Sequence, residues 1–124
     1  AVHDFHTAFN LTVGQGPELP DKDIRALRRK LLNEEFTEYL QGESKSDLVE
    51  IADALADMIY IACGTAVAYG IPLDQVFAEV HRSNLSKLGS DGKPIYREDG
   101  KVLKGPDYTP PDVQGVLARA LASS

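Results

Sequence analysis

The stretch that decides the fold is residues 50–69, EIADALADMIYIACGTAVAY. Its charged residues are Glu50, Asp53 and Asp57, and all three are acidic. On a helix, Asp53 lies about 60° and Asp57 about 20° around the axis from Glu50, so the three carboxylates share one narrow face. The other faces are apolar, and a helix apolar nearly all round is normally buried. Three buried like charges are costly unless something neutralises them.

The preceding segment supplies a second acidic group. It predicts a helix from Asp21 or Asp23 to about Leu40, with Gly42 as its C-terminal stop. If the two helices pack antiparallel across residues 41–45, their acidic groups face each other. The inward face of this first helix changes from leucine to glutamate along Leu27, Leu31, Glu34 and Glu38, with Glu35 beside them.

Up to six carboxylates would then surround one cavity. Oxygen ligands without histidine or cysteine favour Mg²⁺ or Mn²⁺ over Zn²⁺. A di-iron site is disfavoured because such bundles use Glu-x-x-His pairs, whereas His3, His6 and His81 lie off these helices. The simpler alternative is that the acids are solvated or paired with the neighbouring basic residues. Those basic residues are expected to be mostly solvated: Arg25, Arg28, Arg29 and Lys30. The predicted metal ligands are Glu34, Glu38, Glu50, Asp53 and Asp57.

The rest of the chain predicts one all-α domain, residues 1–124, with a small hairpin at about 94–104. The hairpin is indicated by Asp99-Gly100, a dipeptide suited to a tight turn between two short apolar runs. A loop is expected at 11–20. Short helices are predicted at 2–10 and 113–121. A long helix is expected to begin at a cap on Ser44 or Ser46 and to end at Tyr69, before Gly70. Another is expected to open at Pro72 and Asp74 and to reach about Lys87.

Composition restricts the function. The formal net charge of -6 argues against a general nucleic-acid binder, which needs a basic surface. A single cysteine, Cys63, and the lack of a basic-then-apolar start favour a cytoplasmic protein. The longest charge-free stretch, residues 58–73, is shorter than the roughly 20 residues of a spanning helix, so a soluble chain is expected.

The acidic pattern resembles a known family. Glu34-Glu35-x-x-Glu38 followed by Glu50-x-x-Asp53 is similar to the signature of the all-α nucleoside triphosphate pyrophosphatases, which include MazG-like proteins, dimeric dUTPases and phosphoribosyl-ATP pyrophosphohydrolases. The similarity covers roughly residues 24–112 and looks closest to short MazG-like, phosphoribosyl-ATP-pyrophosphohydrolase-like proteins. It continues through Asp57-Met-Ile-Tyr60, Gly64-Thr-Ala, residues 77–87, and the Asp91 and Gly100 segments.

The resemblance implies a helical bundle that oligomerises and Mg²⁺-dependent cleavage between the α- and β-phosphates, which gives a nucleoside monophosphate and pyrophosphate. Because the apolar surface of residues 48–69 needs more cover than one chain supplies, we expect four-helix cores completed by oligomerisation, as a homodimer or a dimer of dimers. Deoxynucleotides such as dUTP are attractive substrates, consistent with nucleotide-pool housecleaning. In this family the second motif, E-x-x-D, often stands directly before an apolar run. Here that run follows Asp57, which would place Ala54 where the first acid of the motif is expected. Either Glu50 and Asp53 form the motif, or Asp53 substitutes for Ala54 and works with Asp57.

Further roles follow from the same comparison. Glu35 is predicted to orient or deprotonate the attacking water, with Glu38 as a second catalytic carboxylate. Tyr60 and Phe77 are expected in the core rather than as base-stacking platforms. The predicted substrate-binding residues are Arg82, Asn84, Lys87, Lys101 and Lys104. Three alternatives stay open: phosphoribosyl-ATP hydrolysis, a relative that binds without turnover, and a non-catalytic helical interaction or regulatory module whose acids bind a basic partner.

Overall fold

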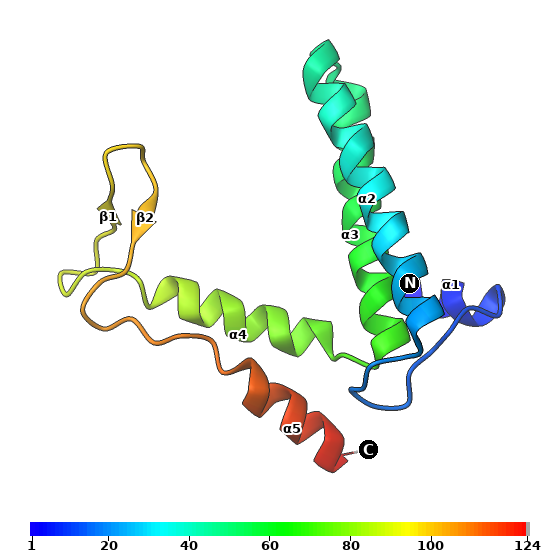
Figure 1. Cartoon of the computed structure of the whole chain (residues 1–124). Helices are drawn as coiled ribbons and strands as arrows, with labels where there is room; N and C mark the ends of the chain where they lie inside the picture. Colours follow the sequence, from blue (N-terminus) through cyan, green and yellow to red (C-terminus); the bar gives the residue numbers. More distant parts are fainter. Residues whose placement is uncertain (124) are drawn as a thin grey trace. The chain divides into compact units, whose positions relative to one another are not determined.

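The computed structural model describes residues 1–123, which form two compact units, residues 1–71 and 72–123. Helices hold 62% of the chain, and one two-stranded antiparallel hairpin follows the fourth helix of the described part (Figure 1). The predicted fold class, all-α with a small C-terminal hairpin, is therefore confirmed. The elements are α1 (Val2–Ala8), α2 (Lys22–Lys45), α3 (Leu48–Tyr69), α4 (Leu73–Leu85), β1 (Ile95–Tyr96), β2 (Val102–Leu103) and α5 (Val113–Ser123).

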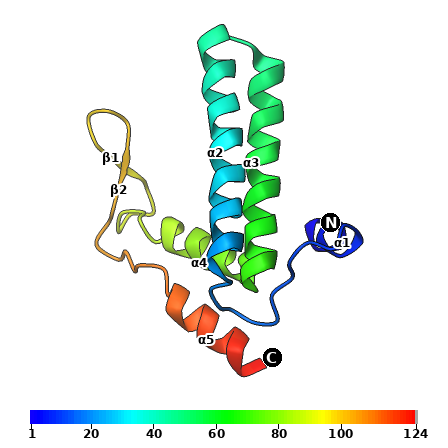
Figure 2. The same cartoon turned by 45° about the vertical axis from the view of Figure 1, so that its right-hand side comes forward.

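Helices α2 and α3 form a long antiparallel hairpin, side by side in both views (Figures 1 and 2). The Asp21 side chain caps α2 by accepting from the N–H groups of residues 23 and 24, at 3.1 and 3.0 Å. The predicted stop at Gly42 is wrong, because α2 continues to Lys45 and ends at Ser46 in the left-handed conformation. The predicted serine cap of the next helix is also wrong. Asp47 performs that role and accepts from Glu50 N–H at 3.2 Å.

Gly42 instead lies inside α2, where the helix packs closely against the start of α3. A Cβ atom there would lie 3.0 Å from Ile51 Cγ1 and 3.1 Å from Ile51 N. The glycine therefore lets the two backbones meet, which is a packing role rather than a terminating one. By contrast, Gly70 ends α3 with a φ of 67°, as predicted.

The inward face of α2 differs from the predicted one. Leu27 is 48% exposed and Glu34 is exposed, whereas Arg28 is only 7% exposed and Glu35 is half-buried. The inward face thus starts one residue later than expected. Leu27 and Glu34 share one face of α2, and Arg28 and Glu35 share the neighbouring face. The sequence alone does not show which of these two faces packs against α3. The expectation that Arg28 is solvated is wrong for the same reason.

Helix α3 buries small residues and leaves large ones exposed. Ala54, Gly64, Ala66 and Ala68 are buried, and these small side chains let α2 and the loop before it approach closely. The expectation that α3 is buried all round is not met in a single chain, since Ile59 is 67% exposed. By length and composition α3 could also cross a membrane, a test that core helices of soluble proteins pass as well. The apolar residues of α2 and α3 that stay exposed include Leu32, Phe36, Leu40, Leu48, Val49, Leu55 and Ile59.

The second unit contains α4, the hairpin and α5. Strands β1 and β2 pair Ile95 with Leu103 and Tyr96 with Val102, and Gly100 turns the chain with a φ of 88°, as the Asp99-Gly100 dipeptide predicts. Ser83 on α4 is 2% exposed and donates from Oγ to the Thr109 carbonyl at 2.8 Å, which fixes the loop that leads into α5. Phe77 is 71% exposed, so its predicted core position is wrong within this chain.

Candidate functional site

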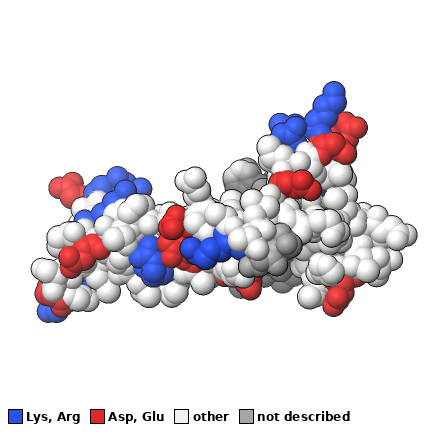
Figure 3. All heavy atoms as spheres, turned by 90° about the horizontal axis from the view of Figure 1, so that it is seen from below, with Lys and Arg blue, Asp and Glu red and all other residues white. Residues whose placement is uncertain are grey.

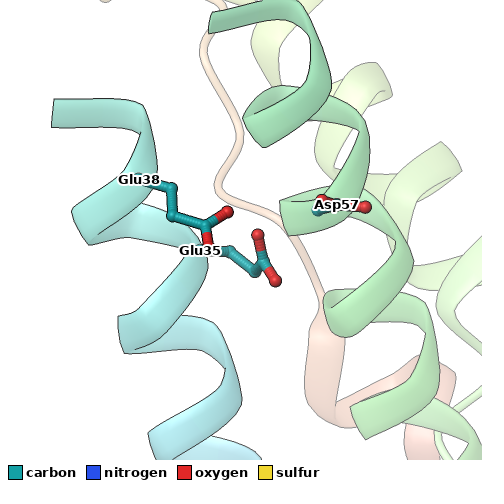
Figure 4. A group of neighbouring side chains, drawn as sticks. All are labelled: Glu35, Glu38 and Asp57. Carbon is teal, nitrogen blue, oxygen red and sulfur yellow. The ribbon is translucent and has the colours of Figure 1, made fainter. Parts of the chain in front are cut away.

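The antiparallel hairpin brings three carboxylates together. Glu35 and Glu38 on α2 point towards Asp57 on α3 (Figure 4), and one oxygen of each lies within 4.8 Å of the others. We call these three residues the acid cluster. The structure therefore brings acids of the two helices together, as predicted, but only one of them, Asp57, comes from α3. Glu35 and Asp57 are half-buried, whereas Glu38 is exposed.

Within the acid cluster, the pKa of Glu35 is shifted from its ordinary value. Burial, the close approach of Glu38 and the negative charges of Asp57 and Glu38 together raise the pKa of the Glu35 carboxyl to about 7. Its Oε2 atom is buried and has no hydrogen-bond partner in the described residues. A carboxylate oxygen that is shielded from water and lacks a hydrogen-bond partner is costly in its charged form, and either a proton or a bound cation would reduce that cost.

The acid cluster fits a hard divalent cation. Its donors are carboxylate oxygens alone, the set that Mg²⁺ and Mn²⁺ prefer. Among the described residues, no lysine or arginine forms an ion pair with any of its three members. The simpler alternative of neutralisation by Arg28, Arg29 or Lys30 therefore finds no support in the ion pairs of this part of the chain.

The other predicted ligands lie outside the acid cluster. Glu34 is exposed on the neighbouring face of α2, and Asp53 is exposed one turn before Asp57. Glu50 accepts from Lys45 Nζ at 3.5 Å, near the connection between the helices. Ala54 is 1% exposed, so the position where the family pattern expects an acid is packed inside the helical hairpin. Metal ligation by Glu34, Glu50 and Asp53 stays a prediction.

The predicted phosphate-binding residues all belong to the second unit. Arg82 is held there by a bidentate pair with Glu79, at 2.7 and 2.9 Å, and by a bond of 2.6 Å to Thr109 Oγ1. Glu79 also accepts from Asp112 N–H at 2.7 Å, and the Arg82 bonds together with this one lower its pKa to about 2. Arg82 thus anchors the loop before α5, and its assignment to substrate stays a prediction.

The remaining four residues of that set are not engaged in the same way. Asn84, Lys101 and Lys104 are exposed and Lys87 is half-buried, while Lys104 Nζ lies 4.8 Å from the centre of the Tyr108 ring. Basic side chains at the hairpin end of this unit lie among acidic ones (left side of Figure 3). Substrate binding by these four residues also stays a prediction.

A pocket beside the acid cluster contains residues that sequence reasoning missed. It has a volume of about 280 Å³, and its wall is mostly apolar. His6, from α1, is 3% exposed and hydrogen-bonds through Nδ1 to the Thr12 carbonyl at 2.8 Å. The spacing of Arg28 and Glu35 could have indicated that they line one pocket, because residues seven apart lie two turns along the same face of a helix. Residues that line the pocket include Phe5, His6, Arg28, Glu35, Asp57 and Tyr60.

This fold and this site define a class of proteins: helical hairpins that carry a cluster of carboxylates suited to a divalent cation. Comparison with known proteins specifies the family. The sequence pattern of the phosphoribosyl-ATP pyrophosphohydrolase family matches residues 2–84, about two thirds of the chain, and the chain belongs to this family.

Two further proteins are similar to this chain. The chain resembles the crystal structure of a candidate NTP pyrophosphohydrolase from Exiguobacterium sp. 255-15, with 26% identity, a TM-score of 0.55, and coverage of 98% of this chain and 94% of that one. It is also 31% identical over 78 residues to the uncharacterized protein L479 of Acanthamoeba polyphaga mimivirus. That match covers 63% of this chain and 29% of the viral protein, so the chain spans less than a third of that relative.

Proposed function

We propose that this protein is a Mg²⁺-dependent nucleoside triphosphate pyrophosphohydrolase that cleaves between the α- and β-phosphates and releases a nucleoside monophosphate and pyrophosphate. The observation that carries the proposal is the acid cluster, in which Glu35, Glu38 and Asp57 come within 4.8 Å across two consecutive helices. The family match supports the reaction class, and the similar bacterial structure supports a triphosphate as substrate.

In this mechanism Glu38 and Asp57 would hold the metal, with Asp53 and Glu34 as further candidate ligands from the adjoining turn and face. A bound Mg²⁺ or Mn²⁺ would screen the triphosphate charge and lower the pKa of a coordinated water. Glu35 would accept a proton from the attacking water. In the metal-free protein, burial and the neighbouring acids raise the pKa of the Glu35 carboxyl to about 7. A bound cation would lower this pKa, so that Glu35 would be a carboxylate able to accept a proton near neutral pH.

The identity of the nucleotide substrate is a separate part of the proposal. A deoxynucleoside triphosphate such as dUTP is the substrate we favour, with a housecleaning role in the cytoplasm. The second candidate is phosphoribosyl-ATP, and the specific observation in its favour is the family match over residues 2–84. Both substrates undergo the same cleavage at the acid cluster, so only a direct comparison of substrates separates them.

We also propose that the active form is a homodimer or a dimer of dimers. Ile59 is 67% and Phe36 47% exposed, and a groove of about 380 Å³ lined by Leu32, Phe36 and Met58 opens beside them. A contiguous apolar surface of this kind is unusual in a monomer. Ile59→Glu should lower the molar mass measured by light scattering to that of one chain. A wild-type protein that is already monomeric at micromolar concentration would contradict the proposal, and co-flotation with lipid vesicles would indicate a membrane as the occupant of this face.

The test of the reaction is pyrophosphate release from a panel of nucleoside triphosphates and phosphoribosyl-ATP, with Mg²⁺, Mn²⁺ or EDTA. Asp57→Asn removes one charge from the acid cluster and should abolish release. Glu43→Gln, an exposed acid near the end of α2, is the matched control and should leave release unchanged. Folded wild-type protein that releases pyrophosphate from none of these substrates, with metal present, would favour the helical interaction module instead.

A further inference from the structure

The pocket beside the acid cluster has a chemically mixed lining. It includes the acids Glu35 and Asp57 and also the cation Arg28. Arg28 and Glu35 are seven residues apart on α2, which places them about 10 Å apart along the helix axis. A substrate whose phosphates lie at the acids would direct its sugar and base along the pocket towards Arg28.

Arg28 is held in an unusual way for a buried cation. Its side chain is 7% exposed, and Nε donates to Thr65 Oγ1 at 3.0 Å while Nη2 donates to the Ile61 carbonyl at 2.9 Å. Among the described residues no carboxylate lies within ion-pair distance of it, and Nη1 makes no hydrogen bond. A buried guanidinium with free donors and no carboxylate partner is suited to an acceptor that arrives with a ligand.

The surroundings of Arg28 keep its guanidinium in place. A Cβ atom on Gly64 would lie 2.5 Å from Arg28 Nη2 and 2.8 Å from His6 Nε2, so only glycine leaves room for both side chains. The Thr65 hydroxyl also donates to the Ile61 carbonyl, at 3.0 Å, so this carbonyl keeps a partner if the arginine is removed.

Two aromatic rings in the lining of the pocket suit a flat ligand. Phe5 from α1 and Tyr60 from α3 pack edge to face with ring centres 5.6 Å apart, and both line the pocket. Tyr60 is 37% exposed, so its expected core position is wrong and its ring remains available for stacking. The volume of about 280 Å³ is below that of most pockets for whole ligands, roughly 300–1,000 Å³, and suits a base rather than a complete nucleotide.

We propose that this pocket binds the nucleobase of the substrate and that Arg28 selects bases that carry a carbonyl group. Uracil, thymine, cytosine and guanine carry a carbonyl oxygen that can accept from a guanidinium, whereas adenine carries an amino group at C6 and has only ring nitrogens as acceptors. This inference rests on the proposed function for the position of the phosphates. It adds Arg28 as a specificity-determining residue and assigns α1 a part in the site.

The test compares two purines of similar size that differ chiefly at C6, where guanine carries a carbonyl and adenine an amino group; guanine also carries a 2-amino group. Binding of dGMP and dAMP is measured by calorimetry with EDTA present, for the wild type, Arg28→Met and Arg29→Met. Arg29 is the matched control, since it is the exposed neighbour of Arg28. The wild type should bind dGMP about 10- to 100-fold more tightly than dAMP, the usual effect of a hydrogen bond to a charged group. Arg28→Met should remove this preference, and Arg29→Met should retain it.

A second measurement needs no variant. In wild-type protein, dGMP and dUMP should shift the side-chain N–H resonances of Arg28, and dAMP should not. No dGMP preference in the wild type, an equal preference in both arginine variants, or no binding of any monophosphate would overturn the proposal. Binding of monophosphates is measured without turnover, so it tests the base pocket independently of the proposed reaction. If only the proposed reaction is wrong, the protein will bind monophosphates selectively but release no pyrophosphate from triphosphates.

Discussion

Replacing Glu35 by glutamine should stabilise the metal-free protein while it removes activity. The physical reason is that Glu35 is a half-buried carboxylate beside Glu38 and Asp57, with an unpaired Oε2 atom. A glutamine at this position would retain the size of the side chain and remove its charge. The folded protein would then no longer hold three negative charges around one point.

The magnitude follows from the pKa of the Glu35 carboxyl, which rises from 4.5 to about 7 on folding. Between these values the folded state binds more protons than the unfolded state, so wild-type stability falls as pH rises from 4.5 to 7 and stays low above it. The full difference corresponds to about 3 kcal/mol, and solvent screening at this partly exposed cluster reduces it to about 1 kcal/mol. For a chain of this size the melting temperature should rise by roughly 3–6 °C.

The assay is thermal unfolding in EDTA at pH 5, 6, 7 and 8, for the wild type, Glu35→Gln and Glu34→Gln. The stabilisation by Glu35→Gln should be small at pH 5 and reach its full value at pH 8. Glu34→Gln is the matched control for stability, because its carboxylate is exposed one residue away and outside the acid cluster. A gain that is equal at pH 5 and pH 8, or equal in the two variants, would refute the reasoning.

Three further predictions follow from other contacts. Mg²⁺ should raise the melting temperature of the wild type and have a smaller effect on Asp57→Asn, because the metal stabilises only a folded state that binds it; an equal rise in both would count against ligation at Asp57. Gly42→Val should lower the free energy of unfolding by about 1–3 kcal/mol, since its Cβ would meet Ile51 at 3.0 Å, and denaturant titration measures the loss. Because the Arg82 pair lowers the pKa of Glu79 to about 2, the stability it gives is present above about pH 4.5 and is lost towards pH 2; Glu79→Gln should remove this pH dependence in acid unfolding curves, and an unchanged curve would exclude the pair as its cause.

The composition of α3 was enough to predict the helical hairpin and part of the site. Three acids on one face of an apolar helix, preceded by a helix with acids of its own, lead us to expect that an antiparallel pair would bring the two groups together. Asp57 and Glu38 do meet, whereas Glu50 and Asp53, which share the face of Asp57, lie outside the acid cluster. The Asp99-Gly100 turn was predictable for a similar local reason, since its positive φ angle needs glycine.

The features that the sequence did not predict depend on the partner of each element. Which face of α2 meets α3 is decided by packing, so Arg28 is buried and Leu27 is exposed, the reverse of what their polarity indicates. Gly42 is a helix stop by composition and a close contact in the structure, because Ser46 and Asp47 together end one helix and start the next. The pocket wall contributed by Phe5 joins segments more than fifty residues apart, which no local pattern reveals.

The most direct test of the central claim is to identify the products by ³¹P NMR after incubation of a nucleoside triphosphate with the protein and Mg²⁺. The acid cluster predicts a nucleoside monophosphate and pyrophosphate in equal amounts, with no turnover by Asp57→Asn under the same conditions. A nucleoside diphosphate and inorganic phosphate as products, or full activity in Asp57→Asn, would contradict it.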